Sequence, residues 1–181
     1  MTFTRMDRST KADWDHIAHE SVEAWSLVPD RILELLRSLA DTTTGFAVDQ
    51  LEHALQTATR AERAGADYDV VVAALCHDIG KAISEPNHPA IAAALLNPYV
   101  RAEVVWIVDV HQDFQGRHYY AFLGKDPDAR KGHARHPAYA LAERFADEWD
   151  QTSFDPDYDT LPLEHFEPLV RDIFAAPRYL Y

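Results

Sequence analysis

The sequence is short of cysteine and of hydrophobic runs long enough to cross a membrane. Its single cysteine, Cys76, excludes an internal disulfide framework and fits a reducing cytosol. No apolar stretch approaches the roughly 18 residues that a membrane helix needs. The first residues, MTFTRMDRSTKADWDH, lack the apolar core of a signal peptide. We therefore expect a soluble, cytoplasmic protein without a membrane partner.

Basic side chains are also scarce in comparison with acidic ones. The 181 residues include 17 Lys and Arg against 30 Asp and Glu, which gives a formal net charge of −13. Such a charge repels a phosphate backbone and argues against nucleic acid as a partner. With 47% hydrophobic and 26% charged residues, the chain has a globular composition and the length to bury a core within one domain.

Signals for β-structure are few, whereas helix signals are frequent. Strict alternation of apolar and polar residues is scarce, and only 6 glycines are spread through the chain. Ser9 or Thr10 can cap a first helix, Pro29 suits the first turn of a second, and Gly65 can end a third. The fold class is predicted to be all-α. Helices are expected over residues 11–25, 29–40, 48–65, 70–80, 89–96, 100–114, 136–150 and 163–174.

The stretch VVVAALCHDIGK, residues 70–81, places two ionisable residues at the end of an entirely apolar segment. A helix that is apolar on all sides is a core helix, and an ionised carboxylate there is costly unless something compensates its charge. Adjacent helical residues point about 100° apart, so His77 and Asp78 are better placed to share a metal ion than to bind each other. An ordinary helix end, with Asp78 paired to Lys81, remains open.

Four other residues are candidates to complete a metal site. His111 lies on the apolar stripe of the helix expected over 100–114 and should face inward. His88 directly precedes a helix and could be a simple cap. His53 lies opposite the apolar stripe of its helix, and Asp150 lies at the flank of another, so each taken alone is expected at the surface.

The order of these residues resembles the HD-domain superfamily, which is all-α and binds metal through the pattern H…HD…D. Two further histidines between the HD pair and the last Asp mark the members with two metals. The resemblance covers residues 46–160 and implies one HD domain over 1–181, with N-terminal helices at 1–40 and a C-terminal helix at 161–181. The metal ligands that it implies are His53, His77, Asp78, His88, His111 and Asp150.

Within the superfamily, the chain looks more like the mixed-valent di-iron oxygenases, such as myo-inositol oxygenase and the hydroxyalkylphosphonate oxygenases. The segments QLEHALQTATRAERAGAD and FADEWDQTSFDPDYDTLPLEHF carry this similarity. It implies two irons as Fe(II)/Fe(III), bridged by Asp78, that use O₂ to cleave or oxidise a small hydroxylated substrate. The same ligands suit Mn, Zn or Co. A metal-dependent phosphohydrolase acting on a phosphate ester is the alternative, and a non-enzymatic metal-binding module is a third possibility.

The residues expected around the substrate depart from the phosphonate oxygenases. A tyrosine and a glutamate that guard the iron site there are replaced by Thr43 and Phe46, and a phosphonate-binding lysine is replaced by Gln115. Lys81 stands where myo-inositol oxygenase has a substrate-contacting lysine, which implies a catalytic role for it. The resemblance therefore does not imply that the substrate is a phosphonate.

The long connection after His111 offers further candidates for substrate contact, because long loops often carry function. Each of them could equally be an ordinary surface residue. The predicted substrate contacts are Lys81, Gln115, His118, His133 and His136.

Overall fold

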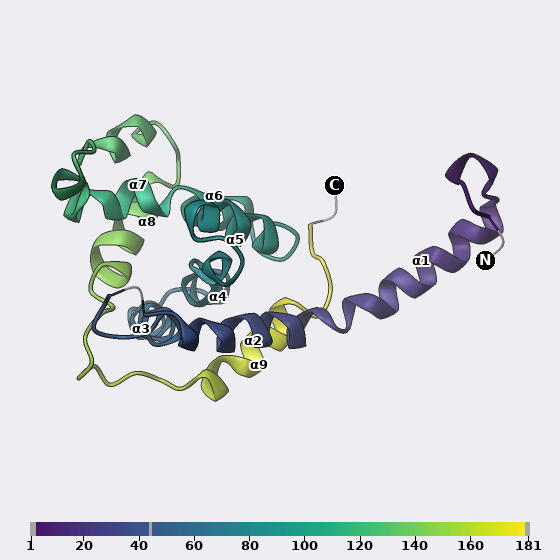
Figure 1. The fold of residues 1–181 in the computed structure, drawn as a ribbon, viewed down its shortest axis with the longest axis horizontal. Helices are drawn as coiled ribbons and strands as arrows, with labels where there is room; N and C mark the ends of the chain where they lie inside the picture. The colour runs from purple at the N-terminus through teal and green to yellow at the C-terminus, as the bar shows by residue number, and fades with distance from the viewer. Residues whose placement is uncertain (1–2, 44, 180–181) are drawn as a thin grey trace.

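The computed structural model describes residues 3–43 and 45–179, and these residues form helices and no strand (Figure 1). The prediction of an all-α fold is therefore confirmed. The α-helices are α1 (Lys11–Trp25), α2 (Val28–Ser38), α3 (Gln50–Arg63), α4 (Tyr68–Cys76), α5 (His88–Leu96), α6 (Ala102–Asp109), α7 (His111–Gln115), α8 (Tyr139–Arg144) and α9 (Leu163–Ile173). A π-helix, η8 (Phe145–Asp150), continues α8, and short 3₁₀ turns connect several of the other helices.

Helix α4 is the centre of the core. Asp67 caps it by accepting a hydrogen bond from the backbone N–H of Val70, and every residue from 70 to 76 is buried. The helix packs against α3, α6 and α9. Full burial of a Val or Leu side chain contributes about 1.5–3 kcal/mol, so α4 anchors the fold. Because α4 ends at Cys76, His77 and Asp78 emerge from this anchor at a fixed point.

Helix α3 is buried on more sides than its apolar stripe predicts. Asp49 caps its first turn, and Gly65, with φ of 73°, follows its end. Its polar face is covered by the chain that follows η8: the Gln56 amide donates to the carbonyl of Asp155 at 2.7 Å, and further bonds reach residues 152 and 161. The pattern of this helix, taken by itself, placed His53 at the surface. That expectation is wrong, because the covering segment leaves the side chain of His53 0% exposed.

Two of the expected helices are interrupted close to candidate ligands. The segment 100–114 breaks at Val110, whose φ and ψ of −103° and 3° are not helical, so that His111 begins the separate helix α7. The segment 136–150 becomes α-helical only at Tyr139, and its last part widens into the π-helix η8. Single π-turns occur often at functional sites, and this one ends on Asp150. Asp150 is fully buried, so its expected place at the surface is also wrong.

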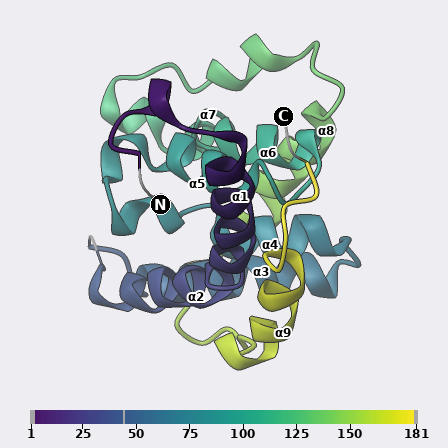
Figure 2. The same cartoon turned by 90° about the vertical axis from the view of Figure 1, so that its right-hand side faces the viewer.

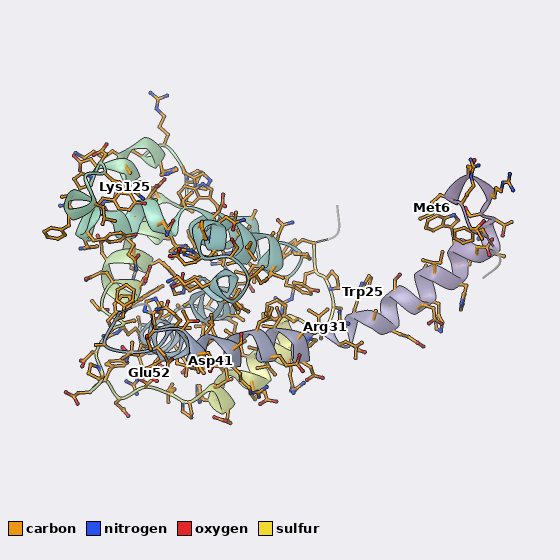
Figure 3. The ribbon with its side chains drawn as sticks, viewed as in Figure 1. Met6, Trp25, Arg31, Asp41, Glu52 and Lys125 are labelled. Atoms are coloured by element: carbon orange, nitrogen blue, oxygen red, sulfur yellow. The ribbon has the colours of Figure 1, made fainter. Side chains whose placement is uncertain are left out.

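Helix α1 projects away from the other helices in Figure 1, and in Figure 2, seen from that side, it lies in front of them. A capping box between Thr10 and Asp13 begins it, but none of its residues is buried. Figure 3 shows Met6 at the far end of this projection, with Trp25 near the point where the chain rejoins the bundle. No helix among the described residues is long and apolar enough to cross a membrane.

Candidate metal centre

The six residues proposed as ligands come together from five parts of the fold. His53 lies on α3, His77 and Asp78 follow the end of α4, His88 begins α5, His111 begins α7, and Asp150 ends η8. All six are at most 2% exposed. Their polar atoms divide into two groups that meet at Asp78.

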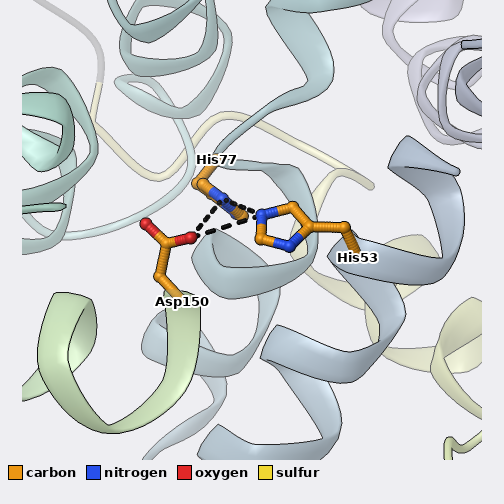
Figure 4. A group of neighbouring side chains, drawn as sticks. All are labelled: His53, His77 and Asp150. Carbon is orange, nitrogen blue, oxygen red and sulfur yellow. Dashed lines mark hydrogen bonds and ion pairs between the residues drawn. The ribbon is translucent and has the colours of Figure 1, made fainter. Parts of the chain in front are cut away.

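The first group contains His53, His77 and Asp150 (Figure 4). The Nε2 atoms of the two histidines are 3.2 Å apart, and Oδ1 of Asp150 lies 3.3 Å from Nε2 of His53 and 3.6 Å from Nε2 of His77. Oδ2 of Asp78 lies 3.5 Å from both Nε2 atoms. Two nitrogens and two oxygens therefore surround one point, which is a typical donor set for a transition-metal ion.

The second group contains His88 and His111. Their Nε2 atoms are 3.3 Å apart, and Oδ1 of Asp78 lies 2.9 Å from the first and 3.4 Å from the second. Asp78 thus directs one carboxylate oxygen at each group. That is the arrangement expected of a carboxylate that bridges two metal ions.

Backbone carbonyls fix the orientation of all four imidazoles. A carbonyl can only accept, so the ring nitrogen facing it must carry the proton, and the other nitrogen presents a lone pair. Such outer hydrogen bonds commonly orient histidines that bind metal. The Nδ1–H groups donate as follows: His53 to Ser153 at 2.9 Å, His77 to Ala74 at 2.8 Å, His88 to Glu85 at 2.7 Å and His111 to Val108 at 2.7 Å.

The chemistry of this donor set fits two cations. With Nδ1 protonated, the Nε2 lone pairs within each group face each other at 3.2–3.3 Å, which is repulsive unless a proton or a metal ion lies between them. Oδ1 of Asp78 and Oδ2 of Asp150 are buried without a hydrogen-bond partner, and such groups are costly unless compensated. Two metal ions would satisfy both the lone pairs and the carboxylates.

The two carboxylates are held in their ionised form. Burial acts to raise the pKa of Asp78, but the nearby His77, His111, His88 and Lys81 outweigh it and hold the pKa well below its usual range. For Asp150, burial likewise acts to raise the pKa, and His77 and His53 hold it far below its usual range. Both side chains are therefore available as anionic ligands at neutral pH.

Two residues outside the ligand set bind the carboxylates directly. Nζ of Lys81 donates to Oδ2 of Asp78 at 2.6 Å and to the buried amide oxygen of Gln50 at 2.7 Å. The Gln115 amide donates to Oδ1 of Asp150 at 2.7 Å. The ordinary ion pair between Asp78 and Lys81 thus exists, but one lysine cannot account for four converging imidazoles and a second buried carboxylate.

Gly80 allows the two halves of the centre to approach each other. A Cβ atom at this position would lie 2.3 Å from the backbone oxygen of His88 and 2.7 Å from its Cα. Only glycine leaves room for the turn after Asp78 to pack directly against the start of α5. This contact sets the distance between the HD pair and His88.

A cavity of about 440 Å³ opens onto the centre at Asp78 and His88. Three of the predicted substrate contacts, Lys81, Gln115 and His118, line it. The structure does not bring the other two to its wall. Instead, the Nε2–H group of His133 donates to Oδ2 of Asp113 at 2.8 Å, and His136 stacks on Trp106 with ring centroids 3.5 Å apart.

One wall of the cavity is a stack of three aromatic rings. Phe154 lies between His53 and Phe46, with ring centroids 4.2 Å and 4.5 Å away. In the sequence, Phe46 stands out only as a replacement, and no pattern indicates Phe154 or Gln50. The stack joins residues about a hundred positions apart, so no local pattern indicates it. It screens the first group of ligands from solvent.

A polar cluster lies beside the cavity at Asp147. This carboxylate accepts hydrogen bonds from Arg130 at 2.9 Å and 3.0 Å, and it lies 2.9 Å from Nε2 of His118. Burial acts to raise the pKa of Asp147, but Arg130 and His118 outweigh it and lower the pKa. The positive charge of His118, when protonated, is therefore matched by an acid outside the cavity.

The chain matches a known protein family. A family described as the HD domain matches residues 51–155, a range that contains all six residues of the centre. A comparison with curated proteins finds no match.

Proposed function

Because the chain belongs to the HD-domain family, whose members are generally metal-dependent enzymes, we propose that it is a di-iron oxygenase. In this proposal it uses O₂ to oxidise or cleave a small hydroxylated substrate in the cavity above Asp78. His53, His77 and Asp150 would hold one ion, and His88 and His111 the other. Asp78 would bind both.

Iron in this position would supply one-electron redox chemistry toward O₂. The contributions of the chain itself follow from the contacts described above. The carbonyl-anchored histidines hold their Nε2 lone pairs in place without rearrangement. The stack of Phe46 and Phe154 on His53 limits the access of water from that side, which restricts side reactions.

The observation that carries the proposal is that the cavity has no uncommitted cation among its described lining residues. Lys81 lies 2.6 Å from Asp78, and His118 lies 2.9 Å from Asp147. Enzymes that act on phosphate groups generally offer free Lys or Arg side chains to the phosphoryl oxygens. Here a phosphate ester would find no unpaired positive charge other than that of the metal ions. A substrate that presents a hydroxyl to the metals fits this lining better.

The test is a comparison of iron-loaded and zinc-loaded protein. The iron form, purified without oxygen and then partly oxidised, should give an electron paramagnetic resonance signal from a coupled Fe(II)/Fe(III) pair. His111→Ala removes a ligand of the second group and should abolish the coupled signal. His136→Ala should retain the coupled signal, because His136 lies outside the cavity wall and stacks on Trp106. Hydrolysis of phosphate esters by the zinc form without oxygen would overturn the oxygenase assignment in favour of the phosphohydrolase.

A further inference from the structure

The one ionised residue of the cavity wall that has no ion-pair partner among the described residues is an acid, Glu85. Its backbone carbonyl holds the ring of His88, so its side chain starts three residues from a ligand of the second group. The two basic residues of the wall, Lys81 and His118, are neutralised by Asp78 and Asp147. Apart from the metal ligands, Glu85 therefore carries the one charge of the described wall that no opposite side chain pairs.

An aromatic surface lies in the same wall. Both faces of Phe154 are covered, by His53 and by Phe46, so Phe46 presents the open ring of the stack and is 50% exposed. Tyr119 lines the cavity as well, and burial raises the pKa of its phenol well above the usual value, which keeps it neutral. Aromatic faces attract cations, most strongly where water is partly excluded.

The charge of the whole chain acts in the same direction. A formal net charge of −13 raises the local concentration of cations and lowers that of anions around the molecule. The cavity volume of about 440 Å³ suits a small molecule. Charge and size together favour a small cationic ligand over a sugar phosphate or a dicarboxylate.

We propose that the substrate is an amino alcohol, which presents a hydroxyl to the metal centre and a cationic nitrogen to Glu85 and Phe46. This inference rests on the proposed function, because it assumes that the hydroxyl is the group directed to the metals. The structure supplies an acid and an open aromatic ring in the wall for the nitrogen. The Gln112 amide, which also lines the cavity, can bind further polar groups of the substrate.

Two alcohols of almost the same shape test the charge alone. Choline has a positively charged quaternary nitrogen at its branch point, and 3,3-dimethylbutan-1-ol has a neutral carbon in the same place. Titration calorimetry on the iron-loaded protein should show choline binding about tenfold tighter, as expected for a partly desolvated cation beside an acid and an aromatic ring. The anionic alcohol 3-hydroxypropanoate should bind more weakly than either.

Variants assign this preference to the cavity wall. Glu85→Gln keeps the backbone carbonyl that orients His88, and it should remove most of the preference for choline without changing the metal content. Phe46→Leu keeps apolar cover and should reduce the preference further. Glu164→Gln is the matched control, because it removes one exposed acid on α9 and should keep the wild-type preference.

The outcomes separate this inference from the proposed function. Equal affinity for choline and 3,3-dimethylbutan-1-ol, or tighter binding of 3-hydroxypropanoate, overturns the amino alcohol. In that case, a coupled iron signal that changes when the neutral alcohol binds still supports the oxygenase. A clear preference for choline that Glu85→Gln removes, in a protein without any coupled iron signal, overturns the oxygenase and keeps the cationic ligand.

Discussion

Replacing Gly80 with alanine should separate the two halves of the metal centre. The added Cβ would lie 2.3 Å from the backbone oxygen of His88, and ordinary van der Waals contact begins at 3.4 Å. The start of α5 must therefore move by about 1 Å, because backbone cannot rotate away as a flexible side chain can. Metal sites tolerate deviations of only about 0.2 Å in ligand distance. His88 should be lost as a ligand, while His53, His77 and Asp150 keep their positions.

The expected result is a fall from two bound ions per chain to about one, measured by elemental analysis after removal of loosely bound metal. Inserting a methyl group into a packed region should also lower the free energy of unfolding by about 1–3 kcal/mol. For a chain of this size that corresponds to a fall in melting temperature of roughly 2–12 °C. Circular dichroism on heating measures this shift.

Gly132→Ala is the matched control, because a Cβ atom at that position would meet nothing within 4 Å. It should keep both ions and the wild-type melting temperature. A Gly80→Ala protein with two tightly bound ions and unchanged stability would refute the reasoning. It would show that the contact between the turn after Asp78 and the start of α5 does not determine the second site.

Three further predictions concern other parts of the molecule. Lys81→Met should keep both ions, because all six ligands remain, and should lower kcat/KM about tenfold, because a charge-assisted hydrogen bond to Asp78 is lost. Loss of one or both ions would contradict this prediction and show that the six ligands do not hold the metal without Lys81. The lowered pKa of Asp147 contributes stability at pH values above its unfolded pKa, and this contribution disappears as the pH falls through the folded pKa. Below about pH 4, the free energy of unfolding should therefore fall less steeply with decreasing pH in Asp147→Asn than in the wild-type protein. Urea titrations at several pH values measure this difference. Deletion of residues 1–25 should leave the metal content and the urea midpoint unchanged, because no residue of α1 is buried, and a lowered midpoint would contradict this reading.

The parts of the fold that depend on local pattern could be predicted from the sequence. The apolar run before His77 correctly indicated a buried helix, and the inward position of His111 followed from its stripe. The burial of His53 could not be read from its helix, because its cover comes from a segment about a hundred residues further along. Only the resemblance to the HD domain pointed to it.

Backbone interruptions were equally invisible in the sequence. The break at Val110 and the π-helix that ends at Asp150 occur in segments whose composition fits continuous α-helix. His111 follows the first interruption and Asp150 ends the second, so tertiary packing overrides local preference where the centre is built. His133 and His136 show the opposite case. Their position in a long connection suggested substrate contact, but the structure places His133 against Asp113 and His136 on Trp106.

The hydrogen bond between the His53 ring and the Ser153 carbonyl joins residues 100 positions apart and has a consequence for biosynthesis. A chain still emerging from the ribosome has the HD pair before it has Asp150 or the segment that covers α3. Contacts of such long range form late in folding. Metal should therefore enter a nearly complete scaffold, in which the apolar packing of α4 already supplies stability. In a cell short of metal, this protein should accumulate folded and empty, ready for activation, rather than be degraded as an unfolded chain.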